Sequence, residues 1–170
     1  MWVNIVLLIV VTVCVITDLK SRKIYNNLIF PALAIAFGIH IITGGWEGLA
    51  HSLLGFTLGL GILIIPYLLG GMGAGDVKLL ALVGALKGAG FVFAASVYMA
   101  LIGAVMALAI VFFKEGIRDR IRFVGYVLLC LRFRMRPHIQ GYWTSGAYPY
   151  GVAIAGGSVV CLWLKGWGAG

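Results

Sequence analysis

Two carboxylates stand out in a chain that is almost entirely apolar. Of its 170 residues, 62% are hydrophobic and only five are acidic. Asp18 and Asp76 adjoin apolar runs, where an ionisable side chain is costly unless it is hydrated, paired or functional. Two carboxylates that meet can share a proton, so that one acts as general base and the other as general acid. That chemistry activates water against a peptide carbonyl.

Glycines crowd the segment in front of Asp76. Four of the six preceding positions are glycine: Gly70, Gly71, Gly73 and Gly75. We expect these glycines to take positive φ and to let an extended peptide approach the main chain closely. Gly73, Gly75 and Lys78 are therefore predicted as loop and substrate-binding residues. Lys78 faces away from Asp76 on a helix, and we expect it to anchor that helix or to tune the local electrostatics.

Each aspartate also has a structural explanation. Asp76 could cap the start of the helix that follows it, by accepting hydrogen bonds from backbone N–H groups. Asp18 could pair at the membrane interface with nearby basic residues, namely Lys20, Arg22 or Lys23. The residues alone leave the structural and catalytic interpretations open.

The elements that must position these residues are membrane helices. Charged residues make up 11% of the chain and the mean hydropathy is +1.09, whereas soluble domains carry about 25% charged residues. We predict one polytopic, all-α membrane domain over residues 1–170. Apolar runs predict about six transmembrane helices, at 2–17, 27–43, 48–69, 76–89, 90–113 and 148–167. The first run lacks a basic flank and a cleavage site, so we expect a spanning helix there and no removed signal.

Small residues within these runs mark expected helix contacts. Gly55 and Gly59 form one pair at a spacing of four, and Gly84 and Gly88 form another. Such pairs let the backbones of membrane helices approach closely, and we interpret them as packing positions without chemistry.

Basic residues set the orientation. Of 13 lysines and arginines, 11 lie in the loops at 18–27 and 114–147 or, as Lys78 does, directly after the loop at 70–77; only Lys87 and Lys165 lie elsewhere. Positive charge gathers on the cytoplasmic side of membrane proteins, so these loops are predicted to be cytoplasmic. Asp18 and Asp76 then lie at the same membrane face, with the active site facing the cytoplasm.

The segment 114–138 combines basic residues with a helical apolar period. Apolar side chains recur at Ile117, Ile121, Val124 and Leu128. We predict a basic amphipathic helix lying on the cytoplasmic leaflet, in contact with membrane lipids. Attraction to anionic lipid and the positive-inside bias explain the net charge of +8, so no nucleic-acid partner is expected. The three cysteines form no CxxC pair and no histidine stands at ligand spacing, so no metal or cofactor is predicted.

Three segments resemble one family. Gly73-Ala74-Gly75-Asp76 fits the GxGD motif of intramembrane aspartyl proteases, and the run "GAGDVKLLALVGAL" resembles the type IV prepilin peptidases, which carry a lysine two residues after the aspartate. The stretch "DLKSRKIYNNL" is similar to that family's first catalytic segment, although Tyr25 stands where a proline is usual. The stretch "YPYGVAIAGG", 148–157, is similar to the segment that opens the family's last helix.

The resemblance implies a membrane aspartyl endopeptidase in the cytoplasmic (inner) membrane. It would remove the leader from prepilin-like protein substrates, with Asp18 and Asp76 as catalytic residues and without a cofactor. The sequence has no paired CxxC motifs, so we expect one of the small peptidase-only members, of the tight-adherence (Flp) pilus or preflagellin peptidase type. Which branch it is, and which aspartate is acid or base, stay open.

Two other functions fit parts of the pattern. A small proton- or cation-coupled transporter could use Asp18 and Asp76 as ion sites, and would place them near the membrane midplane. An assembly scaffold without catalysis would tolerate neutral substitutions at both positions. The predicted interfacial position of the two aspartates favours the peptidase.

Overall fold

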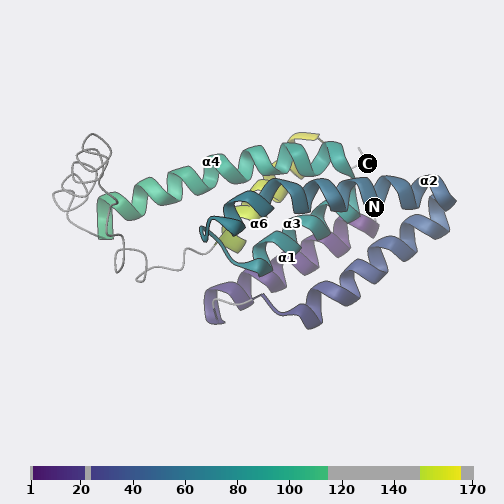
Figure 1. Ribbon diagram of the computed structural model, residues 1–170, viewed down its shortest axis with the longest axis horizontal. Coiled ribbons are helices and arrows are strands. Elements are labelled where there is room, and N and C mark those ends of the chain that lie inside the picture. The colour runs from purple at the N-terminus through teal and green to yellow at the C-terminus, as the bar shows by residue number, and fades with distance from the viewer. Residues whose placement is uncertain (1, 22–23, 115–149, 166–170) are drawn as a thin grey trace. The chain divides into compact units, whose positions relative to one another are not determined.

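The computed structural model describes residues 2–21, 24–114 and 150–165, and all its regular elements in these ranges are helices. The predicted all-α class is therefore confirmed. Figure 1 shows the helices in chain order: α1 (Trp2–Ser21), α2 (Asn26–Leu68), α3 (Ala74–Lys87), α4 (Ala89–Lys114) and α6 (Tyr150–Lys165). Residues 1–102 and 148–170 belong to one unit and 103–147 to a second. The amphipathic helix predicted at 114–138 lies outside the described residues, apart from Lys114 itself.

Three of the described helices are long and apolar enough to cross a membrane: Val3–Ser21, Asn26–Leu68 and Ala89–Ala109. The length and the apolar composition of these helices indicate that the chain is a membrane protein. At 14 residues, α3 is shorter than the roughly 20 residues that a single crossing needs. The count of six spans stays a prediction.

The helix α2 is a hairpin with two antiparallel arms. Its 43 residues would extend about 65 Å if straight, roughly twice the thickness of the hydrocarbon core. Gly45 interrupts the helix with φ 56° and ψ −137°, a conformation that glycine adopts without a steric penalty. The rings of Phe37 and Phe56 then meet edge to face, with centroids 5.9 Å apart. The arms 26–44 and 46–68 correspond to the predicted runs 27–43 and 48–69 (Figure 1).

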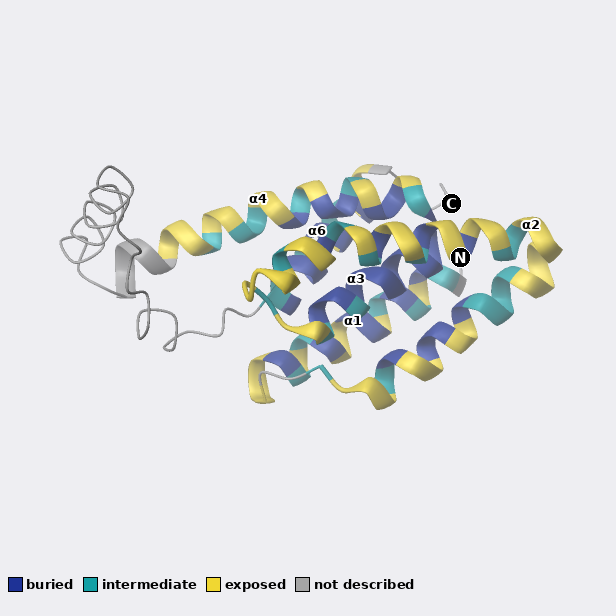
Figure 2. Cartoon of the chain, viewed as in Figure 1, coloured by how far each residue is buried: buried dark blue, intermediate teal, exposed yellow. Residues whose placement is uncertain are grey.

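The short helix α3 is the most enclosed element of its unit. Of its 14 residues, 11 are buried, which means that neighbours cover it on all sides. Contacts come from α1, α2 and α6. Figure 2 shows α3 as an almost continuously buried helix, whereas α2 and α4 expose long apolar faces. Asp76 is thus carried by the helix that the rest of the unit surrounds.

Glycines allow α2 and α3 to touch at the backbone. A Cβ atom on Gly55 would overlap the carbonyl oxygen of Gly84, and one on Gly59 would lie 2.6 Å from the carbonyl oxygen of Leu80. Beside this contact, the Ser52 hydroxyl donates a hydrogen bond of 2.6 Å to the Ala85 carbonyl. The predicted packing role of the paired glycines is confirmed at this interface.

We predict that Gly55→Leu destabilises the protein by about 3 kcal/mol, because the new side chain would force α2 away from α3. Thermal unfolding of the purified protein in detergent measures the effect as a lower Tm. Gly61→Leu is the matched control, since it lies on the same helix with no atom within 4 Å of a Cβ at that position. Equal Tm values for the two variants would contradict the proposed role of the glycine contact.

Candidate active site

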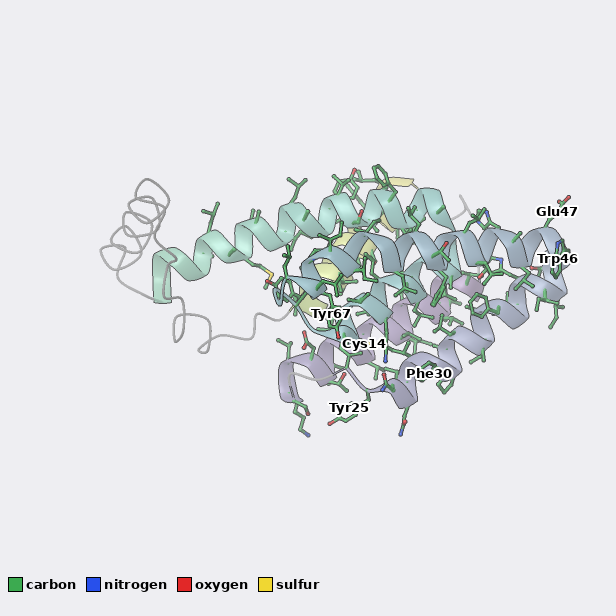
Figure 3. All side chains as sticks on the ribbon, viewed as in Figure 1. Cys14, Tyr25, Phe30, Trp46, Glu47 and Tyr67 are labelled. Atoms are coloured by element: carbon green, nitrogen blue, oxygen red, sulfur yellow. The ribbon has the colours of Figure 1, made fainter. Side chains whose placement is uncertain are left out.

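The ends of three helices enclose a cavity of about 370 Å³. Its lining comes from the end of α1, the segment that leads into α2, and the start of α3, and comprises Asp18, Ile24, Tyr25, Asn26, Gly73, Ala74, Gly75 and Asp76. Tyr25 marks this end of α2 in Figure 3, with Trp46 and Glu47 at the opposite turn of the hairpin. Two carboxylates far apart in the sequence therefore line one cavity.

Asp76 is the third residue of α3 and is 8% exposed. Its Oδ2 atom accepts a hydrogen bond of 3.2 Å from the backbone N–H of Gly73, and its own N–H donates to the Gly73 carbonyl at 3.1 Å. The carboxylate thus helps to close the start of the helix from its third position. The capping residue is Gly73, whereas the structural explanation expects Asp76 itself to be the capping residue. A carboxylate can accept about four hydrogen bonds, so this contact leaves capacity for water or a peptide in the cavity.

Asp18 lies one turn before the end of α1 and is 7% exposed. Its Oδ2 atom accepts a hydrogen bond of 3.1 Å from the backbone N–H of Gly151, the second residue of α6. A helix leaves its first N–H groups without intrahelical partners, and Asp18 satisfies one of them. Only glycine fits here, because a Cβ atom on Gly151 would lie 2.6 Å from the Asp18 carboxylate oxygen.

Gly151 is the site residue that sequence reasoning missed. The segment 148–157 resembles a family motif, but the sequence alone assigns no role to Gly151. The available signal was a proline and an aromatic residue followed by glycine at the start of an apolar run. Such a signal predicts the start of a helix, but it does not predict which side chain will contact that start.

The glycines before Asp76 do not all behave as predicted. Positive φ occurs at Gly70 (φ 75°) but not at Gly71, Gly73 or Gly75, so the expectation is wrong for those three. The reason is that α3 already begins at Ala74, which places Gly75 in helical conformation, while Gly73 is extended with φ −81°. Gly75 instead permits close packing, since a Cβ atom there would lie 2.8 Å from the Cβ of Ile24.

Lys78 does not belong to the residues that line the cavity. Its ammonium group donates a hydrogen bond of 2.9 Å to the side-chain oxygen of Asn26 and lies 5.4 Å from the centre of the Phe30 ring. Lys78 therefore connects α3 to the first turns of α2. It contacts Asn26, which does line the cavity.

Within the described ranges, no three side chains among histidine, cysteine, aspartate and glutamate are grouped to hold a metal ion. Cys14 and Cys161 are buried free thiols, and Cys130 lies outside the described residues. The lining residues with polar side chains are instead Asp18, Asp76, Asn26 and Tyr25. This arrangement suits proton transfer to and from a bound peptide or water.

Comparison with known families agrees with this chemistry. The family model described as the type IV leader peptidase family matches residues 5–112, a stretch that contains Asp18, Asp76 and the other lining residues. The match covers more than half of the chain, and the chain belongs to this family of membrane peptidases. Family membership implies a prepilin-like substrate. No curated protein and no solved structure matches the chain.

We predict that Gly151→Ala lowers cleavage of a prepilin-like precursor at least about tenfold, because the added Cβ atom would push the start of α6 away from Asp18. Cleavage is scored by the mobility shift of the precursor in membranes that contain equal amounts of each variant. Gly90→Ala is the control, since a Cβ atom there meets nothing within 4 Å. Unchanged cleavage in the Gly151 variant would show that the contact between α6 and Asp18 has no part in activity.

Proposed function

We propose that the protein is an aspartic endopeptidase that removes the leader from prepilin-like precursors, with Asp18 and Asp76 as its catalytic pair. The observation that supports this proposal is that Asp18 of α1 and Asp76 of α3 line one cavity in a member of a leader peptidase family. Gly73 and Gly75 shape the wall of the cavity beside Asp76.

The proposed reaction needs one ionised and one protonated carboxyl group. The ionised group takes a proton from water as the water oxygen attacks the scissile carbonyl carbon. The protonated group gives its proton to the carbonyl oxygen, which produces a neutral tetrahedral intermediate. When the C–N bond breaks, the proton on the first carboxyl group passes to the departing amine and the intermediate's hydroxyl returns its proton to the second. Two carboxylates that share one proton suit this exchange.

The backbone contacts support such a pair. Each carboxylate accepts one N–H bond at a helix start, from Gly73 for Asp76 and from Gly151 for Asp18. These bonds hold the carboxyl groups in fixed orientations, as proton transfer to a bound substrate requires.

The proposed active site faces the cytoplasm at the inner membrane. The cavity lies where α1 ends and where α2 and α3 begin, and these parts of the sequence carry four basic residues, Lys20, Arg22, Lys23 and Lys78. Positive charge favours the cytoplasmic side, where the hydrophilic leader of a precursor would stay while its apolar helix lies among membrane lipids. A transporter would place the aspartates in the middle of the membrane, and family membership does not support that alternative.

We predict that Asp18→Asn and Asp76→Asn each reduce precursor cleavage at least about a thousandfold, since asparagine cannot exchange the proton. Both variants should insert and fold, because the asparagine oxygen can still accept the N–H bond from Gly151 or Gly73. Glu47→Gln removes an exposed acid at the opposite turn of the α2 hairpin and should cleave normally. Full activity in either aspartate variant would contradict the proposed aspartic mechanism.

A labelling experiment tests the membrane face. Single cysteines at Ser21 and Ala74, both exposed, are placed in a background without the three native cysteines. We expect a membrane-impermeant thiol reagent to label them only after the cells are permeabilised, because Ser21 adjoins Arg22 and Lys23 and Ala74 lies at the same end of the helices, beside the cavity. Glu47→Cys, at the turn of the α2 hairpin, should be labelled on intact cells. Labelling of Ser21→Cys or Ala74→Cys on intact cells would show that the predicted orientation is wrong.

A further inference from the structure

Asn26 lines the cavity, and its side-chain oxygen already accepts a hydrogen bond from another residue. Its side-chain oxygen accepts a hydrogen bond of 2.9 Å from the Lys78 ammonium. A lysine ammonium has only donors, so the asparagine amide must present its oxygen, and not its NH2 group, to Lys78. The Phe30 ring, one turn further along α2, lies 5.4 Å from the same ammonium and helps to keep it on this side of Asn26.

The NH2 group of Asn26 is consequently turned away from Lys78. It has no hydrogen-bond acceptor among the residues that the structure describes. The side chain is not occupied in capping α2 either, because Tyr25 is the capping residue and makes no side-chain cap bond. Two N–H donors thus belong to a residue that lines the same cavity as the two aspartates.

We propose that Asn26 is a substrate-binding residue, which donates a hydrogen bond from its NH2 group to a main-chain carbonyl oxygen of the extended substrate peptide. Lys78 is a positioning residue that acts through Asn26, by holding the amide with its donors available. The inference rests on the proposed function. Peptide carbonyls only accept hydrogen bonds, and an ionised aspartate also only accepts them, so the Asn26 NH2 group is a donor that suits a substrate carbonyl in this cavity.

The first test is Asn26→Asp, measured as steady-state cleavage of a purified prepilin-like precursor by the full-length protein. Aspartate keeps the shape and the oxygen that Lys78 binds, but it replaces the NH2 donor by an acceptor. We expect KM to rise about tenfold with kcat changed far less, because the lost bond contributes to binding the substrate. Asn27→Asp adds the same charge at the next residue, which is exposed and lies outside the cavity lining, and should keep the normal KM.

The second test is a double-mutant cycle. Lys78→Met and Asn26→Ala should each raise KM, while the double variant should be no worse than Asn26→Ala alone, because Lys78 acts only through the amide. Lys78→Arg, which keeps a donor for the Asn26 oxygen, should restore most of the affinity. Thermal unfolding of each variant separates a loss of fold from a loss of binding.

The outcomes are distinct. A normal KM in Asn26→Asp overturns the donor role, and additive effects of the Lys78 and Asn26 substitutions overturn the positioning role. If the unsubstituted protein does not cleave any prepilin-like precursor, the proposed function fails and this inference fails with it. Cleavage by the unsubstituted protein together with an unaffected Asn26→Asp variant refutes the inference alone.

Discussion

At Gly55 and Gly84 the backbones of α2 and α3 lie in direct contact, because neither residue carries a Cβ atom. This contact allows a helix of only 14 residues to be enclosed almost completely by its neighbours. A charged side chain on such a helix could not lie in lipid, so its carboxylate must be at an end where water or polar groups reach it. Asp76 occupies the first turn of α3 and meets that condition. The position of the candidate active site therefore follows from how tightly α3 is packed.

Backbone amides complete the site around this helix. Asp76 accepts an N–H bond from the residue that precedes its own helix, whereas Asp18 accepts one from the start of α6, far away in the sequence. The second contact links α1 to α6, and Gly151 makes it possible by leaving room for the carboxylate. Lys78 adds a third link, between α3 and Asn26 at the start of α2. Four helices thus hold the two aspartates and one amide around a single cavity.

Much of this arrangement could be predicted from the sequence, since apolar runs give the helices and rare acids in those runs mark the site. The all-helical class, the two arms of α2 and the packing role of Gly55 and Gly84 depend on patterns that are local in the chain. The contact of Gly151 with Asp18 depends on how α6 packs, which no local pattern encodes. The glycine-rich sequence predicts positive φ at Gly75, but α3 begins before this residue, and its small size allows close packing against Ile24.

The most direct test of the central claim is whether Asp18 and Asp76 face each other across one cavity in the membrane. Cysteines replace both aspartates in a background without the native cysteines, and a short thiol-to-thiol cross-linker is added to membranes. Intact mass then measures the fraction of chains that carry an internal cross-link. The account predicts efficient cross-linking for this pair and none for a matched pair at positions 18 and 47, which lie at opposite ends of the first unit. Failure of the pair at 18 and 76 to cross-link, with both thiols shown to be reactive, would contradict the account.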